Sequence, residues 1–379
     1  MKIVIVISLF IFLNTLYFAL DSSFKTSIPE SFLIYTTVDY FLSVVVVFII
    51  WYKFSHWFNF EYESIRSNLN KIAGKYVLIL YLFLLIAIYE SYISFQLIMD
   101  GIPRHELLRE YGRANFSYML VSGIFKVLFP VFIFFKVRSH FVFLSLLGLL
   151  FSLVITASRS ELSYAVNFLL ILCIFKVPLN HIVRMGVLGF LLIFLAIYST
   201  VFLQSRPISD GVTAFYDMYQ NLFTYKAYSY HLSHFSITIS QGFETVLFPF
   251  FGYPSEILIR LFTDKHYSVD SNFISDLRYI GSNPITGRPY LANVVYPWWS
   301  WFYGSFGYFG LLLKMIYIYI LLFYFAKNRM MFSTINMLST VLLGASGAHP
   351  FMTVTHTLAF CSYIILDLMY KKLSKKIKF

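Results

Sequence analysis

Long apolar runs recur along the whole chain, separated by short polar stretches. They fall at about residues 2–20, 33–52, 76–97, 116–135, 141–157, 162–178, 185–204, 300–325, 332–347 and 351–369. A helix needs roughly 20 apolar residues to cross the hydrocarbon core of a bilayer, and a helix that is apolar all round is typical of a span. The pattern therefore predicts an all-α polytopic membrane protein with about ten transmembrane helices.

The positions of Lys and Arg predict the orientation of these spans. With the N-terminus inside, sixteen basic residues lie in the inner segments and the tail, whereas five lie in the short outer loops. Cytoplasmic loops carry the excess of positive charge, so we expect both termini inside. A signal peptide is the alternative for the first run, but its length favours a span.

The segment 205–299 is the exception to this plan of short loops. A structureless connection of about 95 residues is uncommon in a compact protein, so we expect helices within it. Aromatic and apolar residues recur at helical spacing over 213–235, and 245–262 is apolar but broken by Pro249, Gly252 and Pro254. The second pattern predicts a pair of interfacial or re-entrant helices. The chain thus divides into spans at 1–204, a loop at 205–299, and spans with a basic tail at 300–379.

The composition agrees with a membrane protein. Of the 379 residues, 59% are hydrophobic and 12% are charged, about half the charged fraction of a soluble domain. The net charge of +11 would suit nucleic acid, but the basic residues gather in short loops and the tail, where topology and anionic lipid explain them. Both cysteines lie in apolar runs, so we expect neither disulfides nor a cysteine metal site.

Arginines on the outer side are the first candidate ligands. Arg113 lies in the loop after the third span, and Arg206, Arg278 and Arg288 lie in the long loop. A guanidinium binds phosphate through paired hydrogen bonds, so several arginines facing one cavity would suit a lipid-linked pyrophosphate. The alternative for each arginine is contact with lipid headgroups or with a loop carboxylate.

Arg159 lies in a four-residue turn between two spans, two residues before Glu161. A charged group at membrane depth usually has a partner or a task, so Arg159 either binds substrate or pairs with Glu161. Five further ionisable residues lie within the apolar runs, namely Asp39, Glu90, Lys126, Lys314 and Asp367. They either line a path for protons or ions, as in a transporter, or form structural pairs between helices.

Glu161 and His349 are the candidate acid–base residues, although a histidine before a proline, as here, more often shapes a turn. The outer side has no Asp-x-Asp pair, and the chain has no HExxH and no phosphate-binding glycine loop. We therefore expect no metal and no cofactor. Trp298, Trp299 and Trp301, at the entrance of a span, are interpreted as an interfacial aromatic belt.

Two motifs resemble those of bacterial O-antigen polymerases of the Wzy type, which join oligosaccharide repeat units. The stretch 156–160 (Thr-Ala-Ser-Arg-Ser), at the end of a span, is similar to the family's Ser-Arg turn. Asn293 and Tyr296, followed by Gly304, Gly307 and Gly310, resemble the family's entry to the span after the long loop. The order of many spans and one dominant late loop resembles the family's architecture.

The resemblance implies a GT-C-like glycosyltransferase architecture in the bacterial inner membrane, with a partly helical periplasmic loop. The implied reaction moves a growing glycan from undecaprenyl pyrophosphate to a sugar hydroxyl of a new lipid-linked repeat unit. It places Arg159, Arg206 and Arg288 at the pyrophosphate, Asn293 at the loop exit or an acceptor sugar, and Glu161 as the base. A chain-length co-polymerase is the implied protein partner, and no nucleic acid is expected.

Two other classes stay open. A lipid-linked oligosaccharide flippase or another transporter would use basic residues inside the membrane, which Lys126 and Lys314 could supply. The long loop counts against a flippase. A membrane O-acyltransferase or a glycan ligase could have as many spans, but an acyltransferase would need a histidine well inside the membrane.

Overall fold

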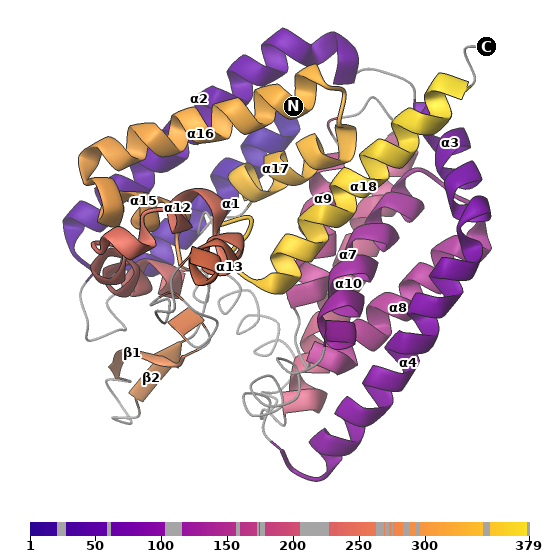
Figure 1. The fold of residues 1–379 in the computed structure, drawn as a ribbon, viewed down its shortest axis with the longest axis horizontal. Helices are drawn as coiled ribbons and strands as arrows, with labels where there is room; N and C mark the ends of the chain where they lie inside the picture. The colour runs from indigo at the N-terminus through magenta and orange to yellow at the C-terminus, as the bar shows by residue number, and fades with distance from the viewer. Residues whose placement is uncertain are drawn as a thin grey trace. The chain divides into compact units, whose positions relative to one another are not determined.

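The chain forms two compact units, each assembled from segments that are far apart in the sequence. The first unit comprises 1–55, 211–329 and 337–357, and the second comprises 56–210, 330–336 and 358–379. The computed structural model (Figure 1) describes residues 1–20, 28–58, 62–102, 116–156, 160–172, 174, 179–204, 227–262, 269, 273–274, 276–282, 289–292, 296–343 and 349–376.

The first unit combines long helices with a set of short elements. Its long helices are α1 (Lys2–Leu20), α2 (Glu30–Phe58) and α16 (Tyr308–Lys327). The short elements are a helix at 227–239, η2 (Phe243–Thr245), α12 (Phe248–Phe251), α13 (Tyr253–Phe262), strands β1 (Arg278–Ser282) and β2 (Pro289–Ala292), and α15 (Trp298–Phe306). Figure 1 shows α2 and α16 running side by side.

The second unit is a bundle of helices. It contains α3 (Tyr62–Lys75), α4 (Val77–Met99), α7 (Phe116–Phe134), α8 (Ser139–Thr156), α9 (Ser160–Leu172) and α10 (Leu179–Gln204). Helix α7 packs against α4, α8 and α9, and α4 also packs against α8 (Figure 1). Helices α17 (Met331–Leu343) and α18 (Val354–Lys376) contribute residues to both units.

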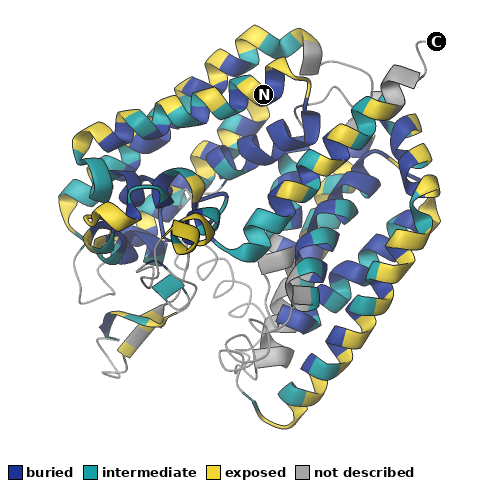
Figure 2. Cartoon of the chain, in the orientation of Figure 1, coloured by how far each residue is buried: buried dark blue, intermediate teal, exposed yellow. Residues whose placement is uncertain are grey.

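Apolar residues cover the outer faces of the long helices. Five helices in the described part of the chain are long and apolar enough to cross a membrane, namely α1, α2, α4, α8 and α16. Large side chains such as Leu78, Leu82 and Leu85 of α4 are more than half exposed, and exposed residues follow that helix along its length (Figure 2). Hydrophobic surface of this extent requires lipid rather than water. The chain is therefore a helical membrane-embedded protein.

Each of the ten predicted apolar runs contains helix, but the run at 300–325 is two helices instead of one. Gly307 adopts φ +58°, a left-handed conformation that favours glycine, and it ends α15 and starts α16. A Cβ on Gly310 would lie 2.1 Å from the carbonyl oxygen of Phe302. The two helices therefore meet through a contact that only glycine permits.

The long loop contains the helices that its pattern predicts, and one element that it does not. The helix at 227–239 covers the end of the predicted range 213–235, whose first part lies outside the described residues. The predicted break within 245–262 is confirmed, because α12 and α13 meet at Gly252, with φ +55°. The unpredicted element is an antiparallel hairpin of β1 and β2, with a shift in register between Tyr279 and Gly281.

The helix at 227–239 is attached to α15 by small residues. The hydroxyls of Ser236 and Ser300 are hydrogen-bonded at 2.6 Å, and Ser305 Oγ donates to the carbonyl of Ser240 at 3.0 Å. A Cβ on Gly304 would lie 2.6 Å from the carbonyl oxygen of Ile237. The long loop is thus packed closely onto the helix that leads into α16.

We expect Gly310→Ala to lower the apparent melting temperature of the purified protein by several degrees. The added methyl group must displace the backbone at Phe302, and overpacking of this kind costs about 1–3 kcal/mol. The matched control is Gly186→Ala in α10, where a Cβ meets nothing within 4 Å. Fluorescence-detected thermal melting in detergent measures both variants, and equal melting temperatures would contradict the role given to Gly310.

Candidate functional site

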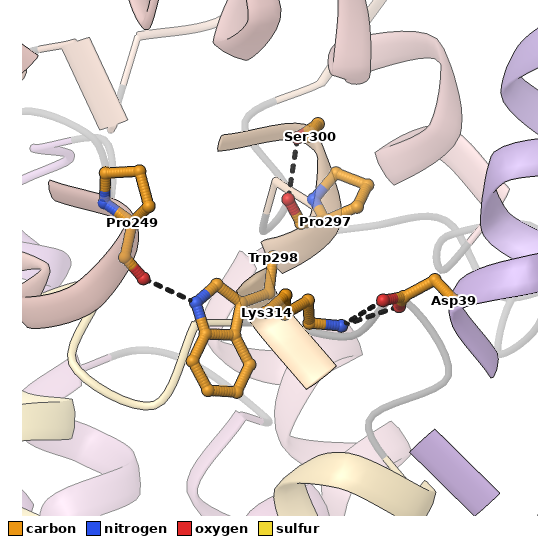
Figure 3. A network of polar contacts seen from close by, with 6 residues as sticks. All are labelled: Asp39, Pro249, Pro297, Trp298, Ser300 and Lys314. Carbon is orange, nitrogen blue, oxygen red and sulfur yellow. Dashed lines mark hydrogen bonds and ion pairs between the residues drawn. The ribbon is translucent and has the colours of Figure 1, made fainter. Parts of the chain in front are cut away.

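A buried ion pair joins the two long helices α2 and α16. Nζ of Lys314 lies 2.6 Å from both carboxylate oxygens of Asp39, and the two side chains are 3% and 11% exposed (Figure 3). Removing two charges from water costs several kcal/mol for each ion, and their attraction offsets this cost only when the geometry is good. The two-oxygen contact meets that condition, so neither residue is an isolated charge.

Trp298, the first residue of α15, covers the ammonium group of Lys314. The Lys314 Nζ lies 5.3 Å from the ring centroid, within the range of a cation–π interaction. The indole Nε1 donates a hydrogen bond to the carbonyl of Pro249 at 2.8 Å (Figure 3). Ser300 Oγ, two residues further along the chain, donates to the carbonyl of Pro297 at 2.6 Å (Figure 3). The ion pair is thereby connected to the broken helix pair of the long loop.

The interpretation of Trp298, Trp299 and Trp301 as an interfacial belt is wrong. The three side chains are 1%, 1% and 0% exposed. Trp299 packs edge-on against Tyr35 of α2, and Trp301 lies in an apolar cluster with Phe248 and Tyr296. The long loop, α2 and α16 together bury the three rings, and the order of apolar runs along the chain does not reveal these contacts.

His349 is fully buried, and both of its ring nitrogens are hydrogen-bonded to backbone. Nε2 lies 3.0 Å from the carbonyl oxygen of Pro249, and Nδ1 accepts from the N–H of Phe351 at 2.9 Å. Because Nδ1 accepts, Nε2 carries the proton and the ring is neutral. Burial lowers the pKa of His349 to about 3. In this arrangement His349 fixes the position of the turn, and it would have to break a hydrogen bond to accept a substrate proton.

The turn at His349 and the break between α12 and α13 fit tightly together. A Cβ on Gly252 would lie 2.3 Å from the carbonyl oxygen of Phe351 and 2.9 Å from Cε1 of His349. The N–H of Tyr253 donates to that same Phe351 carbonyl at 2.7 Å. Tyr317 of α16 donates its hydroxyl to the carbonyl of Phe250 at 2.6 Å. The short helices α12 and α13 of the loop are therefore attached to α16 and to the turn that contains His349.

Arg278 lies on an aromatic platform in the long loop. Its guanidinium carbon is 4.7 Å from the ring centroid of Phe273 and 5.5 Å from that of Phe235. A long contact of 3.4 Å joins it to Asp276, and its side chain is 26% exposed. Nε is buried and has no hydrogen-bond partner in the part of the chain that the structure describes. The rings orient a guanidinium that stays partly exposed, and a guanidinium is a strong ligand of anions.

One of the remaining predicted site residues lies in a described helix. Glu161 is the second residue of α9. Five others lie outside the described residues, and these are Arg113, Arg159, Arg206, Arg288 and Asn293. Where side chains are described, no group of three or more His, Cys, Asp or Glu residues could hold a metal ion.

The second unit contains its own buried polar groups. Asp367 accepts hydrogen bonds from the N–H groups of Phe332 and Ser333, at 3.0 and 2.8 Å, and so caps the start of α17. Ser117 donates to the buried carboxylate of Glu90, and Nζ of Lys126 lies 5.3 Å from the ring centroid of Tyr164. Asp367 therefore has a structural role. Glu90 and Lys126 are the candidates for lining a path for protons or ions.

Comparisons with known proteins assign no family to this chain: no protein-family model, no curated protein and no solved structure matches it. The fold and the site define a class: a helical membrane-embedded protein in which a buried ion pair joins two long helices and Trp298 connects this pair to a folded loop. The resemblance to O-antigen polymerases stays a prediction.

We expect Lys314→Met to lower the free energy of unfolding by about 3–5 kcal/mol, because it leaves the Asp39 carboxylate buried without its cation. Asp39→Asn combined with Lys314→Met removes both charges and should recover most of this loss. Melting temperature and yield from membranes measure the three proteins. A double variant as unstable as Lys314→Met would contradict the assignment of the pair as the source of the loss.

The lowered pKa of His349, about 3, predicts how the stability of the folded protein depends on pH. Unfolded His349 regains its ordinary pKa of 6.5, so the stability from its neutral form is present above pH 6.5 and is lost as pH falls towards 3. The loss is at most about 1.4 kcal/mol per pH unit. We expect melting temperatures of His349→Gln to fall less between pH 7 and 4.5 than those of the wild type. His234→Gln, at an exposed histidine of the same unit, should retain the wild-type slope.

Proposed function

We propose that the chain is a metal-independent polymerase of lipid-linked oligosaccharide repeat units in the bacterial inner membrane. In this proposal ten helices cross the membrane with both termini inside, and 205–299 forms a partly helical periplasmic loop in a GT-C-like arrangement. One observation carries the proposal: the described helices of the loop pack onto α15 and α16 through specific contacts. A loop fixed in this way can hold two glycans in position above their lipids.

The motif that resembles the polymerases has a structural task in this arrangement. Tyr296 is buried beside Phe248 and Trp301, where the long loop leads into α15. Gly304 permits the contact with the helix at 227–239, and Gly310 permits the close turn into α16. The residues that carry the resemblance therefore attach the loop to the spans, which supports a common architecture.

The proposed reaction breaks the bond between C1 of the donor glycan and its pyrophosphate oxygen. The hydroxyl oxygen of an acceptor sugar forms the new bond to C1, its proton passes to a base, and undecaprenyl pyrophosphate leaves with the electron pair. Arginines can stabilise the charge that develops on the leaving group, so the chemistry needs no metal. Positioning both lipid-linked reactants supplies much of the remaining acceleration.

We assign Arg278 to the pyrophosphate or to an adjoining anionic sugar, because its guanidinium is oriented by two rings and its side chain is 26% exposed. The sequence supplies Arg113, Arg159, Arg206 and Arg288 as further anion ligands and Asn293 as a ligand of the acceptor. Glu161 is the proposed base, since the hydrogen bonds of His349 favour a positioning role. A chain-length co-polymerase is the proposed partner.

A transporter of lipid-linked oligosaccharides is the second candidate. Ionisable residues inside membrane helices often line a path for ions or protons, and Glu90 and Lys126 are both buried in the second unit. The pairing of Lys314 with Asp39 removes one of the two basic residues on which this alternative depends. Polymerisation and transport leave different products at the cell surface.

The test is a gel of surface polysaccharide from the native strain, with the gene deleted and then restored. We expect deletion to reduce the ladder to lipid core carrying one repeat unit, because units still cross the membrane and join the core. Loss of that single-repeat band as well would favour the transporter. An unchanged ladder would contradict both functions.

Restoring the gene as Arg278→Gln tests the proposed ligand. Loss of a charge-assisted hydrogen bond costs about 1.5–3 kcal/mol, so we expect roughly 10- to 100-fold less long polymer. Arg260→Gln is the matched control, because Arg260 lies in the same loop, is exposed, and pairs with Glu256 of its own helix. Equal ladders from the two variants, at equal protein levels, would remove Arg278 from the proposed site.

A further inference from the structure

A basic depression of about 870 Å³ lies in the second unit, between α3 and the turn that joins α7 to α8. Five cationic side chains line it, namely Arg66, Lys71, Lys75, Lys136 and Arg138. Its lining, which consists of described residues, includes no acidic side chain. Five like charges at one concave surface repel one another, so the arrangement favours a bound anion.

Hydrogen bonds between the two elements hold this depression in shape. Arg66 Nε donates to the carbonyl of Lys136 at 3.1 Å, and the N–H of Arg138 donates to Oδ1 of Asn70 at 2.9 Å. Lys136 adopts φ +48°, which is uncommon for a residue with a side chain. The turn is therefore fixed on α3, and this attachment places the cations around one concave surface.

The depression lies at the ends of two membrane-spanning helices. Helix α4 starts at Val77, two residues after Lys75, and α8 starts at Ser139, the residue after Arg138. The two helices pack against each other. The 18 residues of α8 span about 27 Å, roughly the thickness of the hydrocarbon core. The depression is thus separated by about a membrane thickness from the other end of α8, at Thr156.

The neighbouring surface of α4 is suited to acyl chains. Leu78 is 80% exposed and Leu82 is 55% exposed, on the first turns that leave the depression. Tyr76, between α3 and α4, has the Lys75 ammonium 5.4 Å from its ring centroid. A cationic concave surface that continues into an exposed apolar helix matches a molecule with an anionic head and a hydrocarbon tail.

We propose that this depression binds the phosphate headgroup of an anionic phospholipid, with an acyl chain lying along α4. Arg138 offers a guanidinium fork to the phosphate oxygens, and Arg66 and the three lysines add positive charge around it. The site is independent of the proposed glycosyl transfer. Free phosphate shares the headgroup chemistry but has no tail for the apolar surface.

The test uses the full-length protein, purified in detergent and stripped of lipid. Phosphatidylglycerol, phosphatidylcholine with the same acyl chains, inorganic phosphate and pyrophosphate are each titrated, with binding followed by native mass spectrometry. The variant Lys71→Gln, Lys75→Gln, Arg138→Gln removes three cations and retains the hydrogen bonds of Arg66 and of the Arg138 backbone. The control Lys53→Gln, Lys327→Gln, Lys372→Gln removes the same charge from positions outside the depression.

We expect wild type and control to bind phosphatidylglycerol in preference to phosphatidylcholine, and the depression variant to bind it about 100-fold more weakly. Equal affinity of the two variants would overturn the site. Binding of free phosphate or pyrophosphate as tight as that of phosphatidylglycerol would overturn the lipid assignment. If the triple variant does not fold, Lys71→Gln and Arg138→Gln alone are compared with Lys53→Gln, with about a fivefold loss expected for each.

Discussion

A carboxylate and an ammonium group buried between apolar helices must remain paired, since either charge alone is too costly to keep away from water. In this chain that constraint joins Asp39 of α2 to Lys314 of α16, and much of the first unit is arranged around the pair. Trp298 covers the cation and bonds to the carbonyl of Pro249, which also lies within hydrogen-bond distance of His349. One network of contacts thus connects the Asp39–Lys314 ion pair, the helix pair α12–α13 of the loop and the turn that contains His349.

Apolar runs and glycine positions were sufficient to predict most helices, because burial in lipid leaves the backbone little choice but to form helix. The break at Gly307 was missed, since it depends on a left-handed residue inside an apolar run. Asp39 lies nine residues after the start of α2 at Glu30, and Lys314 lies six residues after the start of α16 at Tyr308. Recognising the break would have placed both charges in the first half of their helices. The partners are 275 residues apart, so only the fold identifies the pair.

The candidate chemistry was less predictable than the fold. Arg278 emerged from its charge and its place in the loop, but its orientation depends on Phe273 and Phe235, which no spacing rule connects to it. His349 was proposed as a base from residue type alone, and its hydrogen bonds to backbone favour a positioning role. The basic residues near Lys136 were explained by topology, whereas the structure gathers them into a concave surface. Residue type indicates possible chemistry, and the geometry decides among the possibilities.

The most direct test of the proposed polymerase is reconstitution of the purified chain in liposomes with an undecaprenyl-pyrophosphate-linked repeat unit as the sole substrate. The products are followed by mass spectrometry for the number of joined units and for released undecaprenyl pyrophosphate. The account predicts glycans of two or more units and one released lipid pyrophosphate for each new linkage, in the presence of a metal chelator. Intact single units that only move across the bilayer, with no release of the lipid pyrophosphate, would contradict it.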